Sequence, residues 1–261
     1  MRTLVTALTL FVNTIVLGTL VIVADLLGFR KGPGTIFDRA PRWWASSLLR
    51  VSGVDVVVHG AERMRSERAQ VFVANHVSWF DVLAMASVLP HYAFVARSGL
   101  FKVPIFGRGA RAVGTIPIER ENRKAAFQSY EEAAEKMKAG TCVVVYPEGT
   151  RGREYALRPF KKGPFILAIA AGSPIVPTIV HGTIEILPRG SFWLRPGTIH
   201  IHLLEPVEHA GFTYEDRDRL TTIVRDRMAA EMERVYGVKS PPTVLKASGS
   251  VASGGPRLEA T

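Results

Sequence analysis

The stretch that decides the fold class runs from residue 122 to residue 146 and reads NRKAAFQSYEEAAEKMKAGTCVVVY. Its first part repeats small and apolar residues at helical spacing, which predicts a helix over Asn122–Ala139 that stops at Gly140. The β-branched run behind it predicts a strand over Cys142–Tyr146. A helix that leads directly into a short apolar strand is typical of α/β proteins, in which helices cover the faces of a sheet.

The same alternation continues on both sides of this stretch. Periodicity predicts further helices over Trp79–Leu89, Lys162–Ala171 and Asp216–Tyr236. We therefore expect an α/β domain over residues 53–237, with a mixed, largely parallel sheet flanked by helices, followed by a disordered tail over residues 238–261. The other predicted strands are Val54–Val58, Val71–Ala74, Phe94–Ala96, Val113–Ile118, Ile175–Val180 and Thr198–Leu204.

The amino-acid composition limits the kinds of molecule that the protein is expected to bind. The chain of 261 residues has 33 Lys and Arg against 23 Asp and Glu, a formal charge of +10, and a mean hydropathy of +0.14. Such a charge attracts polyanions, which include nucleic acid, anionic lipid and phosphorylated substrates. The sequence holds no compact nucleic-acid motif, so we expect no nucleic-acid partner. The single cysteine, Cys142, excludes a disulfide framework and a Cys-based zinc site, and we interpret it as a buried structural thiol.

Residues 1–52 are predicted to form a membrane-anchoring helical motif. Thr3–Ala24 is uncharged and, as a helix, would reach about 33 Å, enough to cross a bilayer. Because threonines and an asparagine interrupt it, a shallow or re-entrant helix is an alternative, and a cleaved signal peptide is a weaker one. Thr35–Val51 is predicted as an amphipathic surface helix interrupted near Pro41, with Trp43–Trp44 at the headgroups. If the segment spans the membrane, the excess of positive charge behind it predicts a cytoplasmic body.

The first candidate site is Asn75–Asp81, which reads NHVSWFD at the end of a predicted strand. Ser78 is a natural N-cap, and Asp81 falls in the first turn of the following helix. The ring of His76 can turn back so that one nitrogen meets the Asp81 carboxylate, which leaves the other nitrogen as a base for a substrate hydroxyl. A helix-capping aspartate beside a structural histidine is the alternative interpretation.

The second candidate site is Tyr146–Gly152, which reads YPEGTRG directly after another predicted strand. Arg151 offers a planar fork for phosphate, and Glu148 can accept a bond from a substrate hydroxyl or fix the arginine. Because ligand sites collect at the carboxyl ends of parallel strands, the two sites are expected to share one crevice. Basic residues nearby favour a phosphomonoester.

Together these residues resemble the glycerolipid acyltransferase family, most closely its bacterial lysophosphatidic acid acyltransferases (1-acyl-sn-glycerol-3-phosphate O-acyltransferases). The family's NHxxxxD motif is Asn75–Asp81, and its FPEGTR-type motif is Tyr146–Arg151, with Tyr for Phe. Gly114–Arg120 is similar to its second motif, and Pro174–Ile179 to its fourth. The resemblance covers about residues 54–204.

The resemblance implies acyl transfer to lysophosphatidic acid with His76 as general base and Asp81 as its orienting partner. The donor would be acyl-CoA or acyl carrier protein, with no metal or bound cofactor, at the inner, cytoplasmic membrane with its lipid as a partner. Arg97 stands where the family has a phosphate-binding lysine. The substrate-binding residues that the resemblance implies are Arg97, Arg120, Glu148, Gly149, Thr150 and Arg151.

Other functions remain open at this point. The same mechanism could serve another lyso-lipid, such as a lyso-ornithine lipid, because motifs do not name the acceptor. A hydrolase would use the same histidine to activate water, and a binding-only protein would use the charge alone. His200 and His202 alternate on one predicted strand and are interpreted as ordinary strand residues rather than metal ligands.

Overall fold

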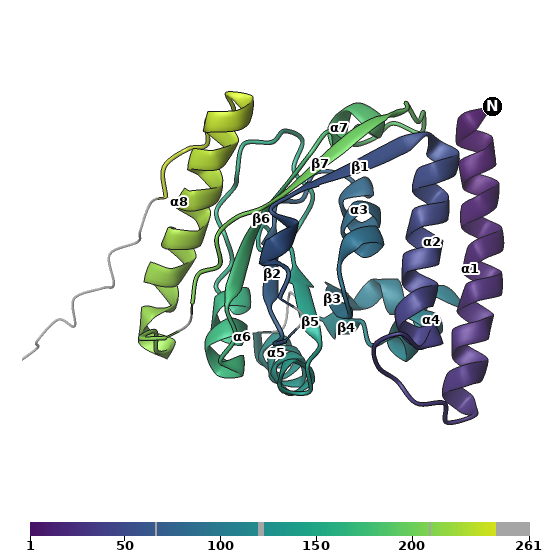
Figure 1. Cartoon of the computed structure of the whole chain (residues 1–261), viewed down its shortest axis with the longest axis horizontal. Coiled ribbons are helices and arrows are strands. Elements are labelled where there is room, and N and C mark those ends of the chain that lie inside the picture. The colour runs from purple at the N-terminus through teal and green to yellow at the C-terminus, as the bar shows by residue number, and fades with distance from the viewer. Residues whose placement is uncertain (66, 120–122, 209, 244–261) are drawn as a thin grey trace, which may run out of the picture.

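The computed structural model describes residues 1–65, 67–119, 123–208 and 210–243. The described strands form one seven-stranded sheet in the order β1-β7-β6-β2-β5-β3-β4 (Figure 1). Only the β6–β7 pair is antiparallel among the described neighbours, so the predicted mixed, largely parallel sheet is confirmed. The strands are β1 Val54–His59, β2 Val71–Ala74, β3 Tyr92–Arg97, β4 Ile116–Ile118, β5 Cys142–Val145, β6 Ile175–His181 and β7 Gly197–Leu203.

The predicted strands match the observed ones to within a few residues, with one instructive difference. The strand expected from Val113 begins only at Ile116. The preceding residues instead close the end of helix α4 (Phe106–Ala112), where Gly114 has a φ of +93° and the Thr115 N–H bonds the Ala110 carbonyl. Because the residues of this turn include apolar ones, their sequence pattern predicted a strand.

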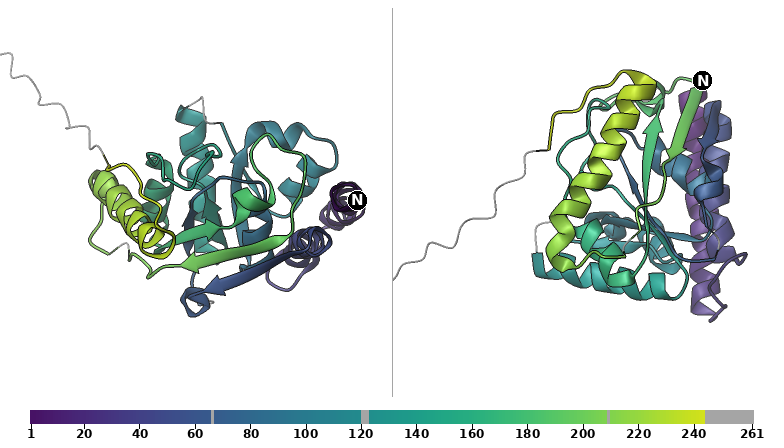
Figure 2. Two further views of the ribbon diagram at one scale, coloured as in Figure 1. Left: turned by 90° about the horizontal axis from the view of Figure 1, so that it is seen from above. Right: turned by 60° about the vertical axis from the view of Figure 1, so that its left-hand side comes forward.

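Helices cover both faces of the sheet (Figure 2). α2 (Ile36–Ser52) and α3 (Phe80–Val88) pack on one face around buried residues such as Phe72 and Val144. α5 (Arg123–Lys138), α6 (Gly163–Ala171) and α8 (Arg217–Tyr236) pack on the other face, around residues such as Val71. The alternating side chains of β2 therefore serve two cores, which is why that strand is apolar without interruption. Cys142 is buried on the α3 face, and burial raises the pKa of its thiol.

The N-terminal helix α1 (Arg2–Leu26) lies beside α2 along its length (Figures 1 and 2). Hydroxyl and amide side chains join the two helices: Thr6 Oγ1 and Ser52 Oγ are 3.1 Å apart, Asn13 Nδ2 donates to Ser47 Oγ at 2.6 Å, and Trp44 Nε1 donates to Thr14 Oγ1 at 3.1 Å. Three of the polar residues that interrupt the apolar segment, Thr6, Asn13 and Thr14, thus face α2. By length and composition α1 is the helix of the described part that is long enough to cross a membrane.

The expected interruption of the second helix near Pro41 is wrong. α2 runs unbroken from Ile36 to Ser52 with Pro41 inside it. A proline removes one backbone donor, but Ala40, Ala45 and Leu48 are buried against neighbouring elements, and this packing outweighs the lost hydrogen bond.

The predicted disordered tail also begins too early. Residues 238–243 have no regular structure but are held in place: the Leu157 N–H donates to Ser240 Oγ at 2.9 Å, and Arg225 Nη2 donates to the Pro241 carbonyl at 2.6 Å. Buried Arg225 therefore ties this segment to the body of the protein. The remainder of the predicted tail, residues 244–261, lies outside the described residues.

Candidate active site

The centre of the site is a contact between His76 and Asp81. His76 follows β2, Asp81 lies in the first turn of α3, and His76 Nδ1 is 2.8 Å from Asp81 Oδ2. The Asp81 side chain is fully buried, whereas that of His76 is 14% exposed. Because a carboxylate can only accept, Nδ1 carries the proton and Nε2 is left with a lone pair. The geometry expected from the spacing of these two residues is present.

Asp81 is held by backbone as well as by side chains. The N–H groups of Val77 and Ser78 donate to Oδ2 at 2.7 and 2.8 Å. Four donors in total, including Thr183 Oγ1 on Oδ1 at 2.6 Å, stabilise the ionised carboxylate in a buried place. The carboxylate thus organises the turn, a role that was predicted for Ser78.

The assignment of Ser78 as N-cap needs correction. α3 begins at Phe80 with Trp79 in the cap position. Ser78 Oγ accepts only a long 3.4 Å bond from the Phe80 N–H and donates to the Leu187 carbonyl at 3.1 Å. The hydroxyl therefore fastens the turn to a distant loop, because the acidic side chain of Asp81 already takes the free N–H groups.

The turn that carries His76 and Asp81 is fastened to β6 and to the short helix that follows β6. Asn75 bonds the Val180 backbone of β6 twice, at 2.9 and 2.8 Å, and Thr183 in α7 (Thr183–Ile186) reaches Asp81. Thr183 was not predicted from the sequence. It lies 102 residues from Asp81, so no local spacing connects the two.

The loop after β5 contacts the backbone of His76 on both sides. Glu148 Oε1 accepts the His76 N–H at 3.0 Å, and the Gly152 N–H donates to the His76 carbonyl at 2.7 Å. The two candidate sites predicted from the sequence therefore form one site. This contact fixes the main chain that carries the imidazole.

Glu148 is occupied by protein groups. Besides His76, its buried carboxylate binds Arg158, whose Nε lies 3.0 Å from Oε2. Arg151 was expected to be the arginine that Glu148 fixes, whereas the arginine bound to its carboxylate is Arg158. Arg158 also donates to the hydroxyl and the carbonyl of Thr150, so it shapes the whole turn. The sequence analysis missed Arg158, because nothing in its surroundings in the chain distinguishes it from a surface arginine.

Gly149 is required by both conformation and space. Its φ is +79°, a region that favours glycine, and a Cβ there would lie 2.9 Å from Lys161 Cε. The Lys161 side chain therefore lies directly against the turn, while its N–H donates to the Pro147 carbonyl at 2.9 Å. This brings one more cation to the site.

Arg151 lies with its guanidinium carbon 4.7 Å from the centre of the half-exposed Trp79 ring. Partial burial and the neighbouring charge of Arg189 lower its pKa. Arg189 Nη1 donates to the Arg151 carbonyl at 2.8 Å. The charges of both arginines lie in the same part of the molecule, and an anion that bound near them would relieve their repulsion.

The other two predicted cations differ in how well they are placed. Arg97 ends β3, beside β5, at the same edge of the sheet as the His76 turn, and its side chain is exposed. Arg120 lies outside the described residues, two positions after β4. The structure therefore brings together His76, Asp81, Glu148, Gly149, Thr150 and Arg151, with Arg97 at the same edge.

Tyr146 stands where the family motif has Phe. Its ring stacks on His76 with 4.2 Å between centroids. Its hydroxyl is buried and has no hydrogen-bond partner among the described residues, and burial raises its pKa well above the ordinary value. The ring therefore supports the imidazole, whereas the hydroxyl is a destabilising group.

We expect Tyr146→Phe to raise the free energy of unfolding by about 1 kcal/mol, because it removes a buried polar group that lacks a partner. Activity that depends on His76 should change by less than about twofold, since the ring that touches His76 is retained. Chemical denaturation of the two proteins would measure the first effect. Lower stability in the variant would show that the hydroxyl has a partner.

We expect Arg158→Ala to lower stability by about 1–3 kcal/mol, because it removes the arginine that is hydrogen-bonded to the buried Glu148 carboxylate. The partial exposure of Arg158 keeps the loss below that of a fully buried pair. Arg153→Ala, an exposed arginine of the same loop, is the matched control and should be neutral. Equal denaturation midpoints for both variants would contradict the importance of the Glu148–Arg158 pair.

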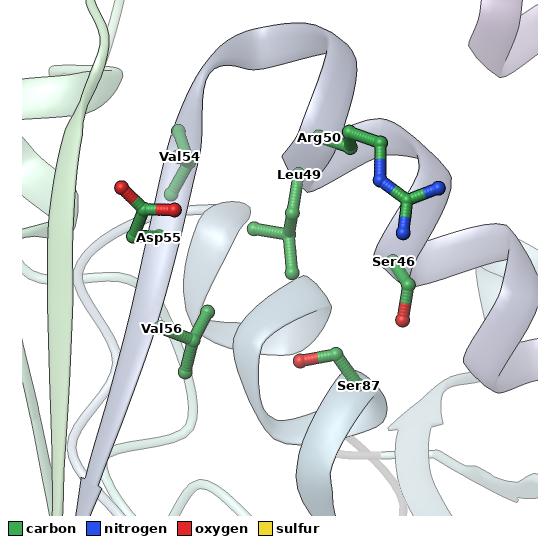
Figure 3. Close-up of a pocket in the computed structure, with 7 residues that line it drawn as sticks. All are labelled: Ser46, Leu49, Arg50, Val54, Asp55, Val56 and Ser87. Atoms are coloured by element: carbon green, nitrogen blue, oxygen red, sulfur yellow. The ribbon is translucent and has the colours of Figure 1, made fainter.

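Two pockets of the described part differ in their position relative to the site. One, of about 290 Å³, is formed by the end of α2, β1 and α3 (Figure 3), and none of its lining residues belongs to the site. The other, of about 270 Å³, adjoins the loop after β5 and is lined by Arg153, Arg158 and Arg189. The second pocket is the better place for an anionic group, because three of its six lining residues are arginines.

The histidines of β7 belong to another part of the molecule. His200 Nδ1 is 3.2 Å from His59 Nε2, the His202 ring stacks on His59 at 4.3 Å, and His202 Nε2 is 2.7 Å from Tyr236 Oη. Burial and the neighbouring His59 lower the pKa of His202 to about 4. Within the described ranges, no group of three or more His, Cys, Asp or Glu is placed to hold a metal ion. These rings join β1, β7 and α8.

Comparisons with known proteins decide the family. The family model described as Acyltransferase matches residues 55–181, which include both parts of the site. A putative 1-acyl-sn-glycerol-3-phosphate acyltransferase of Caenorhabditis elegans is 35% identical over 208 residues, 78% of this chain and 72% of that protein. The chain belongs to the acyltransferase family.

Further relatives of this acyltransferase carry the same type of name. A chloroplast 1-acyl-sn-glycerol-3-phosphate acyltransferase of Brassica napus is 29% identical over 77% of this chain and 59% of its own length. The crystal structure of the 1-acyl-sn-glycerophosphate (LPA) acyltransferase from Thermotoga maritima is 25% identical, with a TM-score of 0.71 over 92% of this chain and all of that one. The fold and the family expected from the sequence are confirmed.

Proposed function

We propose that this acyltransferase moves an acyl chain from acyl-CoA or acyl carrier protein to the sn-2 hydroxyl of 1-acyl-sn-glycerol 3-phosphate, which gives phosphatidic acid for phospholipid synthesis. The observation that carries the proposal is the 2.8 Å contact between His76 and Asp81, beside a loop rich in arginine. The names of the relatives support the choice of acceptor.

In the proposed reaction His76 is the general base. Its free Nε2 removes the proton of the acceptor hydroxyl while the oxygen attacks the thioester carbonyl. The resulting imidazolium is stabilised by the Asp81 carboxylate, and it then gives the proton to the leaving thiolate. The C–S bond breaks as the new ester C–O bond forms. The reaction needs no metal and no resident cofactor, since the thioester is already an activated acyl group.

The proposed phosphate site consists of arginines around the loop after β5. The Arg189 guanidinium binds the backbone carbonyl of Arg151, and Arg97 and Arg120 are the further candidates from the chain. Glu148, Gly149 and Thr150 contribute by shaping the turn: Glu148 accepts the His76 N–H, and Thr150 accepts a bond from Arg158. Gripping the phosphate would hold the hydroxyl close to His76, and such positioning supplies a large part of a rate enhancement.

We propose a shallow membrane position for α1, with the body on the cytoplasmic side of the inner membrane. α1 packs against α2 and α4 along its length, and Arg39, Arg50, Arg108 and Arg111 lie on these neighbours. A perpendicular span would carry these charges into hydrocarbon, which is costly. The exposed apolar residues of α1 favour insertion into one leaflet instead. They include Leu4, Leu8, Phe11, Ile15 and Val16.

The proposal is tested with membranes that contain the full chain, a labelled acyl-CoA or acyl carrier protein, and a panel of acceptors. We expect 1-acyl-sn-glycerol 3-phosphate to be acylated at least about tenfold faster than a lyso-lipid without a phosphomonoester, such as a lyso-ornithine lipid, because arginine forks bind phosphate in preference. No preference for the phosphate would overturn the choice of acceptor. Thioester loss without acceptor at the same rate would indicate a hydrolase.

A further inference from the structure

The loop between α7 and β7 carries two adjacent aromatic side chains in solvent. Phe192 is 84% exposed and Trp193 is 75% exposed, more than any other aromatic side chain whose burial is described. Soluble proteins rarely leave a large aromatic pair at a loop tip without a function, since each such residue carries a large apolar surface. The site described above uses neither residue.

The tip of this loop has a defined conformation. The Trp193 N–H donates to Ser191 Oγ at 3.1 Å, and the Ser191 N–H donates to the Pro188 carbonyl at 3.0 Å. The Arg195 N–H closes the base of the loop on the Ile186 carbonyl at 3.0 Å. The aromatic pair is therefore presented by an ordered turn.

The loop is joined to the N-terminal end of α1. The Leu194 N–H donates to Thr3 Oγ1 at 3.1 Å. The next residues on the exposed side of that helix are Leu4 and Leu8, which are 73% and 63% exposed. The aromatic tip and the apolar face of α1 thus form one surface, and Figure 1 shows the start of β7 close to the N-terminus.

The charge of the loop indicates what covers this surface. Arg189 and Arg195 flank the aromatic pair, both are exposed, and the sequence has no acidic residue from 186 to 204. Indole and phenyl rings flanked by arginines are favoured at the headgroup level of an anionic bilayer. A protein partner would not explain why the patch continues the lipid-facing side of α1.

We infer that the loop 188–196 is a second membrane-inserting element, which places Phe192 and Trp193 among the lipids beside α1. Its base contacts the site, because Arg189 bonds the Arg151 carbonyl and Ser78 bonds the Leu187 carbonyl. Insertion of the tip therefore sets the arginines of the site at headgroup level, where a lyso-lipid acceptor presents its phosphate. This last step rests on the proposed function, whereas insertion itself does not.

Insertion is measured on the full chain in phosphatidylglycerol-containing vesicles, without reference to activity. A nitrobenzoxadiazole label on Phe192→Cys, in a Cys142→Ala background, should shift to the blue and be quenched by lipids spin-labelled near the headgroup. Tyr214→Cys, at an exposed position that precedes α8 on the opposite face of the sheet, is the matched control and should show neither effect. Equal quenching at the two positions would overturn the inference.

A second measurement avoids the cysteine background. Brominated lipids should quench the tryptophan fluorescence of the natural chain more than that of Trp193→Phe, and an unchanged quenched fraction would contradict insertion. For the link to the site, Phe192→Ser/Trp193→Ser should lose about tenfold or more in acylation of vesicle-bound acceptor, yet keep its rate on a water-soluble short-chain acceptor. Equal loss on both acceptors would show that the loop acts on the site without the membrane.

Discussion

His76→Ala is expected to lower the rate of acyl transfer by about 10²–10⁴-fold, since that is the usual contribution of a positioned general base. The fold should survive, because the imidazole is at the edge of the core and its loss removes a single ring contact with Tyr146 and one bond to Asp81. The assay uses 1-acyl-sn-glycerol 3-phosphate and a labelled acyl thioester, with circular dichroism as a check on folding.

The matched control for this variant is His200→Ala. His200 lies on β7, and its ring contacts His59 rather than any residue of the site. Its removal should leave the rate of acyl transfer unchanged within about twofold, because no proton transfer depends on it. Full activity of His76→Ala would exclude His76 as the base, whereas an equal loss in both variants would point to a general defect of folding.

The second large effect is expected for Asp81→Asn, which should reduce the rate by about 10²–10⁴-fold with a moderate loss of stability. An amide oxygen can still accept from His76 and from the N–H groups of Val77 and Ser78, while its NH₂ group turns to Thr183. The geometry is then retained, but the negative charge that stabilises the imidazolium is gone. Steady-state kinetics of the purified variant would measure the effect.

Asp81→Ala separates the structural role of this carboxylate from its chemical role. It leaves two buried N–H groups without an acceptor, each at a cost of about 1–3 kcal/mol, so this variant should unfold more readily than Asp81→Asn. Thr183→Val should fall between the natural protein and Asp81→Asn in rate, because it removes only one of the bonds that orient the carboxylate. If Asp81→Asn transferred acyl groups at the rate of the natural protein, the role of Asp81 would be structural only.

Local patterns in the sequence predict most of the sheet. β2 and β5 were found because both faces of each strand are buried, which requires uninterrupted apolar runs. The helix ending at Gly140 was found because its apolar spacing and stop residue lie within a few turns. Pro41 was misjudged because α2 packs against α1 and α3, and this packing cannot be read from the local pattern around the proline.

The site likewise contains contacts that the local sequence predicts and contacts that it does not. The contact of His76 with Asp81 spans five residues, so spacing alone brings the two groups within reach. The partners of Glu148 and Asp81 are Arg158 and Thr183, whose positions depend on how loops and strands assemble. Residues of this kind carry no local signature, since a surface arginine and a threonine after a strand are common in any sequence.

The bond from Thr183 to Asp81 has a consequence for the time at which the enzyme becomes active. It joins segments 102 residues apart, and Thr183 follows β6, the strand that pairs with β2. A ribosome-bound chain that ends before this point would carry the histidine without the fully oriented acid beside it. A growing polypeptide would therefore reach its full rate only after this part of the chain has folded, since the carboxylate lacks one of its orienting bonds until then.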